Sequence, residues 1–327
     1  MKAPRFWQAD GPLPRVLAPL GWAWSLGASL RGTGRKPFDP GIPVVCVGNV
    51  VAGGAGKTPV ALSLGHRLPR PHFLSRGYGG SESGPLMVRP HEHSHEQVGD
   101  EPLLLAEVAP CWVSRDRIAG ARAARAHDAA ALIMDDGYQD PSLRKTVSLL
   151  VVDGHAGFGN GRCIPAGPLR EPVERALARA SAVVLLGEDR AGVAARIAPI
   201  LRDARPILRA RLEPEVEATA LAGRAVIAFA GIGRPDKFFH TLDELGARVV
   251  QAYAFPDHYC YQQSEITELM TIAATNGAAL ITTAKDIVRV PPQSRDQIGV
   301  LRIVVTWEDE EALQRVLRPA GAGGVMP

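Results

Sequence analysis

The chain has 327 residues, of which 46% are hydrophobic and 22% charged. This composition excludes a disordered chain and predicts two domains, at roughly 150 residues each. The net charge of +3 is too small to indicate nucleic-acid binding, so we expect no nucleic-acid partner. The four cysteines lie far apart without a C-x-x-C pair, which predicts neither a zinc site nor a disulfide framework. We therefore expect buried or idle thiols in a reducing cytosol.

Residues 1–35 combine apolar and basic side chains. One face of a helix is predicted to carry Leu13, Val16, Leu17, Leu20 and Trp24. Basic residues crowd the first forty positions: Lys2, Arg5, Arg15, Arg31, Arg35 and Lys36. Arg15 and Pro19 interrupt the apolar run, so it fits neither a signal peptide nor a membrane span of about 20 residues. The pattern is typical of a helix in a membrane interface, and equally of an amphipathic helix packed on its own domain.

Short apolar runs and helical segments alternate between residues 36 and 212. Buried strands are predicted at 42–50, 130–136, 147–154 and 181–187, and an Ala/Arg-rich helix at 117–129. The strand candidates are nearly continuous in apolar character, which is typical of parallel strands covered on both faces. This order predicts an α/β fold, with helices on both faces of a mostly parallel sheet.

The segment VGNVVAGGAGKTP (47–59) matches the phosphate-binding pattern G-x-x-x-x-G-K-[ST], except that Val51 takes the place of the opening glycine. A predicted strand precedes it and a predicted helix follows, so backbone N–H groups and the positive end of the helix can face phosphates. Lys57 can then reach the outer phosphates, and Thr58 can ligate Mg²⁺. We predict a P-loop NTPase-like domain whose nucleotide-binding residues are Gly53, Gly54, Ala55, Gly56, Lys57 and Thr58.

Two further segments follow along the chain. In FLSRGYGG (73–80), Arg76 comes after a short strand, where its guanidinium can clamp phosphate oxygens or simply lie on a surface turn. In HEHSHE (91–96), alternating histidines would share one face of a strand as metal ligands. No apolar pattern flanks these histidines, which favours a solvated loop.

Acidic pairs occur at two places. Asp100 and Glu101 in VGDEP (98–102) can position a hydroxyl nucleophile and accept its proton, although two acids in a loop are usually just solvated. Asp135 and Asp136 in ALIMDDGYQ directly follow an apolar run, where a carboxylate can hold Mg²⁺. Paired aspartates before a glycine also suit a plain turn, but the neighbouring phosphate loop favours the metal role.

The segment GFGNGRCIPAGPLREP (157–172) is a long loop rich in glycine and proline, and so long a loop is usually functional. Beyond it, residues 206–224 alternate in polarity and predict a pair of linking strands. Strands and helices then alternate again as a second, smaller α/β domain. In FPDHY (255–259), His258 beside an acid at a strand end can orient a catalytic carboxylate, or it can belong to a surface turn.

Eight motifs together, in this order and over about residues 13 to 310, resemble one family, the tetraacyldisaccharide 4'-kinases of lipid A biosynthesis. The motifs are VGNVVAGGAGKTP, SRGYGG, GDEP, DDGYQ, GFGNGRCIPAGPLREP, GIGRPDKFF, FPDHY and TTAKD. In that family the phosphate loop also lacks the opening glycine. The resemblance implies transfer of the γ-phosphate of ATP, with Mg²⁺, to the 4'-hydroxyl of an acylated glucosamine disaccharide 1-phosphate. It also implies a peripheral location on the cytoplasmic face of the inner membrane, and so favours the membrane interface for residues 1–35.

The resemblance also implies roles for individual residues. Asp100 is expected to be the catalytic base, assisted by His258 from the second domain, with Lys57 and Arg76 on the ATP phosphates. Expected around the metal are Thr58, Glu101, Asp135, Asp136 and Glu171. Expected to bind the acceptor are Asn160, Arg162 and Arg170. The domains expected are 1–35 (membrane-interface helix), 36–212 (P-loop domain) and 213–327 (smaller α/β domain, joined by a short strand linker).

Two positions depart from the family pattern: Asp140 stands where His is usual, and Ala284 stands where Glu is common. The alternative from another class is a membrane-associated P-loop switch or scaffold without phosphoryl transfer to a small molecule. GTPases usually recognise guanine through an N-K-x-D motif, whereas Lys285 and Asp286 in TTAKD are adjacent. This difference argues against the alternative.

Overall fold

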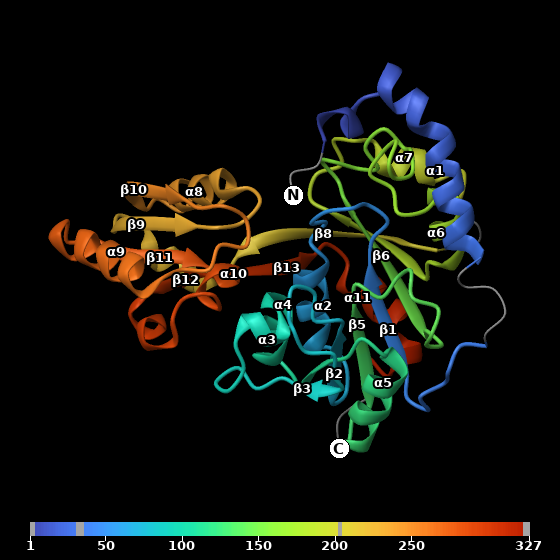
Figure 1. The fold of residues 1–327 in the computed structure, drawn as a ribbon, viewed down its shortest axis with the longest axis horizontal. Helices are drawn as coiled ribbons and strands as arrows, with labels where there is room; N and C mark the ends of the chain where they lie inside the picture. Colours follow the sequence, from blue (N-terminus) through green and yellow to red (C-terminus); the bar gives the residue numbers. More distant parts are fainter. Residues whose placement is uncertain (1–3, 31–35, 202–204, 323–327) are drawn as a thin grey trace.

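The computed structural model describes residues 4–30, 36–201 and 205–322. Lys2, Arg31 and Arg35 of the basic N-terminal group lie outside these ranges. Within them the chain forms a nine-stranded and a four-stranded sheet. The two sheets are joined through β8 (Ile207–Pro214) and β13 (Ile303–Trp307), which run between them in Figure 1.

The nine-stranded sheet has the order β13-β8-β7-β6-β1-β5-β2-β4-β3. Its strands, besides β8 and β13, are β1 (Val44–Gly48), β2 (Pro71–Ser75), β3 (Leu86–Met87), β4 (Cys111–Val113), β5 (Ala131–Asp135), β6 (Val147–Asp153) and β7 (Ala182–Leu186). All neighbours pair in parallel except at the two edges, where β13 and β3 are antiparallel to β8 and β4. Because parallel strands carry their loops at the same edge, the segments that follow β1, β2 and β5 lie together.

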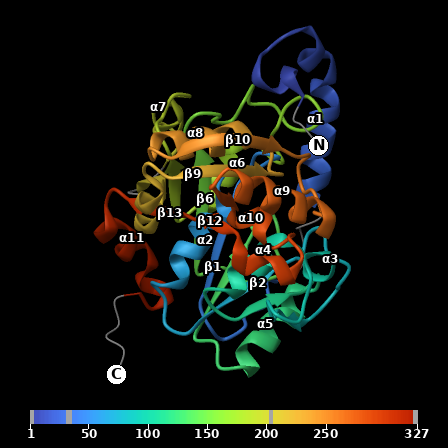
Figure 2. The ribbon, with the colours of Figure 1, turned by 90° about the vertical axis from the view of Figure 1, so that its left-hand side faces the viewer.

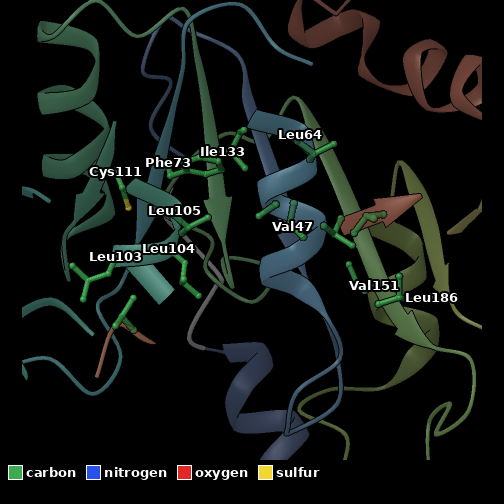
Figure 3. Close-up of a cluster of buried hydrophobic side chains, with 14 of the residues drawn as sticks. Val47, Leu64, Phe73, Leu103, Leu104, Leu105, Cys111, Ile133, Val151 and Leu186 are labelled. Atoms are coloured by element: carbon green, nitrogen blue, oxygen red, sulfur yellow. The ribbon is translucent and has the colours of Figure 1, made fainter. Parts of the chain in front are cut away.

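Helices cover both faces of this sheet. On one face lie α2 (Lys57–Gly65), α4 (Asp100–Ala106) and α11 (Glu310–Leu317); on the other lie α5 (Arg117–Ala126), α6 (Val173–Arg179) and α7 (Val193–Ile197). Successive residues of β1 point to opposite faces, so Val45 and Val47 pack towards α2, and Val44 and Cys46 pack towards α5. Figure 3 shows the α2 side of this core. The predicted α/β fold with helices on both faces is confirmed.

The four-stranded sheet is wholly parallel, in the order β10-β9-β11-β12. Its elements are β9 (Ala225–Ala230), α8 (Pro235–Glu244), β10 (Arg248–Ala254), α9 (Gln263–Thr275), β11 (Ala279–Thr283), α10 (Ala284–Ile287) and β12 (Gly299–Leu301). The sheet packs α8 on one face and α9 on the other. The α10 helix contacts α4, and both lie where the two sheets meet (Figure 2).

Short helices complete the chain: η1 (Arg5–Gln8), α3 (His95–Val98), η2 (Val216–Leu221), η3 (Pro292–Gln297) and η4 (Arg318–Ala320). Near the N-terminus α1 (Pro12–Leu30) runs along the outside of the large sheet, continuing through Pro19 (Figure 1). Pro14 and Gly21 are buried, and a Cβ on Gly21 would lie 2.8 Å from the carbonyl oxygen of Cys163. The helix therefore packs on the 157–172 loop through Gly21.

Two predictions differ from the structure. The pair of linking strands predicted at 206–224 is one strand, β8, followed by η2, because β8 completes the parallel sheet by pairing with β7. The segment 213–327, predicted as one smaller domain, contributes to both sheets. After β12 the chain returns through β13, which pairs with β8, and α11 then packs on the large sheet. The domain boundary itself stays a prediction.

Candidate functional site

The loop between β1 and α2 has the geometry of a phosphate cradle. Gly53 and Gly56 have φ values of 125° and 76°, a region that favours glycine. A Cβ on Gly53 or Gly54 would meet no atom within 4 Å, so the backbone there faces open space. No side chain caps the start of α2, which begins at Lys57 and presents its N-terminus to the loop. Such a helix end attracts anions.

Asn49, which the sequence analysis did not single out, holds this loop from inside. Its side chain is fully buried, and its Nδ2 donates to the carbonyl oxygens of Val51 and Gly53 at 2.9 and 3.4 Å. Its Oδ1 accepts from Nζ of Lys57 at 3.3 Å. The ammonium of Lys57 also lies 3.7 Å from Oδ1 of Asp136. Asn49 therefore fixes both the loop and its lysine.

Asp135 ends β5, next to the loop. Its Oδ2 accepts from the hydroxyl of Thr58 at 3.3 Å, while its Oδ1 is buried without a hydrogen-bond partner among the described residues. Burial raises the pKa of Asp135 to about 7, and the nearby charges of Glu101 and Asp136 add to this effect while Lys57 opposes it. A buried carboxylate oxygen without a partner is costly, and a cation would satisfy it.

Asp136 and Glu171 have different partners. Asp136 has a positive φ of 51° and accepts from Nη1 of Arg170 at 3.0 and 3.2 Å. Glu171 is buried, and its Oε1 accepts from Arg179 at 2.8 Å and from Gln139 at 3.0 Å. Among the described residues, the side chain of Glu171 is linked to the phosphate loop through Gln139, whose Nε2 donates to the carbonyl oxygen of Asn49.

Asp100 begins α4 and is held from the small sheet. Its Oδ2 lies 2.9 Å from Nδ1 of His258 and accepts from Nε and Nη2 of Arg289 at 2.9 and 2.5 Å. Burial would raise the pKa of Asp100, but the hydrogen bonds and charge of Arg289, with a smaller effect of His258, hold it below its usual range. His258 is strained at a φ of 60°, and its N–H donates to the carbonyl oxygen of Gly231.

Arg289, which the sequence did not single out, also belongs to the site. Its side chain is almost wholly buried. Its Nη1 donates to the carbonyl oxygen of Gly231 at 2.9 Å and lies 3.4 Å from Oδ1 of Asp286. Asp286 also accepts from Gly231 N–H and from the hydroxyl of Tyr261. The TTAKD motif therefore builds a buried polar network behind Asp100.

A second contact brings the two sheets together beside Asp100. Nζ of Lys285 lies 3.2 Å from Oε1 of Glu101. The charge of Glu101 raises the pKa of Asp135, and the charge of Lys285 lowers it. One region next to the phosphate loop is thus surrounded by the start of α4, the start of α10 and the end of β5.

The other predicted residues lie farther apart. Arg76 is exposed at the carboxyl end of β2, two strands from β1. Asn160 and Arg162 face the N-terminal segment: Asn160 donates to the carbonyl oxygens of Phe6 and Ala166, and Arg162 pairs with Asp10 at 3.0 Å. The predicted acceptor-binding set is therefore divided between Arg170 at Asp136 and two residues near α1.

The two departures from the family pattern have local explanations. Oδ1 of Asp140 accepts from the N–H of Ser142 at 2.8 Å, which closes a turn. Ala284 is the first residue of α10, and its side chain packs against the core. Neither side chain makes a described contact with Lys57, Asp100 or Asp135.

The phosphate loop with Lys57 could hold a polyphosphate. Asp135 and Thr58 could coordinate a hard cation through oxygen, and Asp100 could accept a proton from a hydroxyl. The chain is also similar to proteins of one family. A model of the family "Tetraacyldisaccharide-1-P 4'-kinase" matches residues 13–321. A tetraacyldisaccharide 4'-kinase of Rhodospirillum rubrum is 53% identical over 97% of both chains, and that of Rhodospirillum centenum is 52% identical over 99% of this chain and 98% of its own. The structure of LpxK from Aquifex aeolicus in complex with ATP is similar with a TM-score of 0.74 and 28% identity, over 94% of this chain and 99% of that one.

Proposed function

Because the chain belongs to the tetraacyldisaccharide 4'-kinase family, we propose that it transfers the γ-phosphate of ATP to the 4'-hydroxyl of an acylated glucosamine disaccharide 1-phosphate. The observation that carries this proposal is the position of Asp100. A carboxylate that is only 11% exposed, held by His258 and Arg289, lies beside the Glu101–Lys285 pair, and the charges of that pair affect the pKa of Asp135 next to the phosphate loop. A nucleotide switch would have no use for such a group.

The phosphate loop and Lys57 bind the ATP phosphates in this proposal. Gly53 and Gly54 leave room for the phosphates against the backbone, and Lys57, held by Asn49, offsets the charge that develops on the transferred group. Arg76, on the loop after β2, is proposed to reach the same phosphates from the side. Its exposed side chain is free to turn towards them.

The residues around Asp135 fit Mg²⁺. The orphaned Oδ1 of Asp135 and the hydroxyl of Thr58 are hard oxygen donors, the kind that this cation prefers. Asp136 and Glu101 add negative charge nearby, whereas Glu171, which binds Arg179, is the weakest of the five predicted ligands. Bound here, Mg²⁺ would neutralise charge on the phosphate oxygens.

Asp100 is proposed to accept the proton of the 4'-hydroxyl. As the sugar oxygen bonds to the γ-phosphorus, the bond from phosphorus to the leaving oxygen of ADP breaks, and the hydroxyl proton passes to Asp100. Arg289 and His258 both contact Oδ2, which leaves Oδ1 for the acceptor. The lowered pKa makes Asp100 a weak base, and this suits a loose transition state in which the hydroxyl loses its proton late.

The 157–172 loop is proposed to connect the site with the lipid. At one end Arg170 contacts Asp136 beside the phosphate loop, and at the other Asn160 and Arg162 contact the segment before α1. A sugar headgroup near Arg170 would then have its acyl chains directed towards α1. The loop residues Asn160 and Arg162 would act mainly by holding this path in place.

The α1 helix is proposed to lie on the cytoplasmic face of the inner membrane. Four of its large apolar side chains face outwards: Val16 is 74% and Trp22 79% exposed, and Leu13 and Leu20 are more than half exposed. Exposed apolar side chains beside basic ones are typical of an interfacial helix. Within the described ranges, every helix falls short of the length and apolar character that crossing a bilayer would require.

Incubation with γ-labelled ATP, Mg²⁺ and an acylated disaccharide 1-phosphate tests the function. We expect label in the lipid product, and none when the 4'-hydroxyl is absent from the acceptor. Transfer of label only to water, or equally to a sugar without acyl chains, would contradict the proposal.

A further inference from the structure

The contact between His95 and Cys260 joins the two sheets at a place that the proposed chemistry does not use. Nε2 of His95, the first residue of α3, lies 3.2 Å from Sγ of Cys260, which belongs to the segment between β10 and α9. Glu96 lies alongside, and one donor atom from each of the three residues falls within 4.8 Å of the others. His95 is half-buried, and Glu96 and Cys260 are exposed, so solutes can reach all three.

We propose that His95, Glu96 and Cys260 form a binding site for Zn²⁺ or a similarly soft divalent cation, which bridges the two sheets. The donor types carry this assignment. A thiolate, an imidazole and a carboxylate are the ligands of zinc sites, and three protein ligands leave a fourth position for water. Mg²⁺ prefers oxygen ligands, so it should bind more weakly than Zn²⁺ to this site. The oxygen-lined site at Asp135 should show the opposite preference.

The distances agree with this site. With Zn–N and Zn–S bonds of about 2.1 and 2.3 Å at a tetrahedral angle, the nitrogen and sulfur lie about 3.6 Å apart. The observed separation is 3.2 Å, so a few tenths of an ångström of movement would admit the ion. Glu96 is exposed, so its side chain can rotate to bring a carboxylate oxygen to the metal as the third protein ligand. On binding, the proton of the Cys260 thiol passes to solvent, and the thiolate sulfur bonds to the metal.

The location gives the site a consequence for turnover, which rests on the proposed function. Cys260 is two residues from His258, and its Sγ lies 4.0 Å from the carbonyl oxygen of His258. His95 lies one helical turn before Gly99, whose N–H donates to the carbonyl oxygen of His95, and Asp100 follows. A metal bridge would therefore lock the segments that carry Asp100 and His258. Because kinases must open to release product, the bridged form turns over more slowly.

Cobalt binding tests the site, because a Co²⁺–thiolate bond gives a charge-transfer absorption in the near ultraviolet. The full chain, without ATP, is titrated with Co²⁺ and then with Zn²⁺. We expect one Co²⁺ per chain and displacement by Zn²⁺. Cys260→Ala should abolish the band, and His95→Gln should weaken binding at least about 100-fold. His93→Gln, in the same stretch, and Cys163→Ser are the matched controls and should bind as the parent does.

Absence of the band in the parent, or an unchanged band in Cys260→Ala, would overturn the site. The turnover arm uses buffered free Zn²⁺ at fixed Mg²⁺: the parent should slow, whereas Cys260→Ala should not. Equal inhibition of both proteins would overturn the effect on turnover. If the proposed kinase function is wrong, lipid phosphorylation is absent even without zinc, while the cobalt titration still decides the metal site.

Discussion

Arg289, in the turn after α10, donates from Nε and Nη2 to Oδ2 of Asp100 across 189 positions of sequence. The guanidinium is buried and is itself held by Asp286 and by the carbonyl oxygen of Gly231. The small sheet thus fixes the side chain that we propose as the base, and it does so with a rigid donor that cannot lose its charge. Arg289 acts through Asp100 and is a positioning residue.

Replacement of Arg289 should slow the reaction without loss of ATP binding. Arg289→Met is expected to lower kcat about 100-fold, because a small displacement of the base is costly. The pKa of Asp100 rises when the guanidinium is absent, so the acid limb of the pH–rate profile should move to higher pH. Arg289→Lys keeps the charge and should recover part of the rate. An unshifted pH profile in Arg289→Met would contradict a role through Asp100.

Asp100 should also contribute pH-dependent stability. Its pKa in the folded chain is below the ordinary value of 3.8, so its contribution is present above that value and is lost as the pH falls through the lower, folded-state pKa. Asp100→Asn leaves Arg289 buried without its main carboxylate and should cost about 3 kcal/mol at neutral pH. Urea unfolding of both proteins between pH 3 and pH 7 measures this. A difference that does not shrink towards pH 3 would refute the interpretation.

The Asp135 carboxylate should matter for the metal and little for the nucleotide itself. Asp135→Asn removes one charged oxygen donor next to Thr58. We expect the Mg²⁺-dependent increase in ATP affinity to weaken at least about 10-fold, since a carboxylate is the main protein ligand that such sites offer. Calorimetric titration with ATP, with and without Mg²⁺, separates the two effects. Equal losses under both conditions would indicate a damaged loop.

The outward face of α1 can be tested by a matched pair of substitutions. Val16→Ser should lower partitioning onto anionic vesicles about 10-fold, because a buried valine contributes about 1.5 kcal/mol. Val250→Ser on β10 makes the same chemical change at another partly exposed valine and should have no effect. Vesicle co-sedimentation measures both. If both variants bind like the parent, α1 is not the membrane contact.

The sequence was most informative where the chemistry is local. The strand, glycines, Lys57 and Thr58 of the phosphate loop are contiguous, so their geometry follows from neighbouring residues, and the parallel sheet follows from the continuous apolar runs. The motif DDGYQ likewise ends a strand next to β1, which places Asp135 at Thr58.

One partner of Asp100, His258, was expected from the family resemblance, but the other, Arg289, could not be predicted. Arg289 follows TTAKD by only a few residues, but nothing local distinguishes it from a surface arginine, and its contact depends on how the small sheet docks. The return of β13 to the large sheet was missed for a related reason. An edge strand that pairs antiparallel at long range has the same alternating pattern as a strand that stays in its own domain.

Asn160 and Arg162 show a different limit. The acceptor-binding role that the family resemblance implies for them stays a prediction, and in the structure these two residues fasten the loop to the N-terminal segment. Nothing in the sequence indicated this contact, because it depends on the packing of α1 through Gly21, which is visible only once the fold is known.

The central claim is that Asp100 accepts the proton of the sugar hydroxyl beside a nucleotide held by Lys57. The most direct test is single-turnover transfer from labelled ATP to the acylated disaccharide 1-phosphate by Asp100→Asn, with ATP affinity measured on the same sample. We predict a rate about 100- to 10,000-fold below that of the parent, with ATP affinity within about twofold. A parent-like transfer rate in the variant would contradict the account.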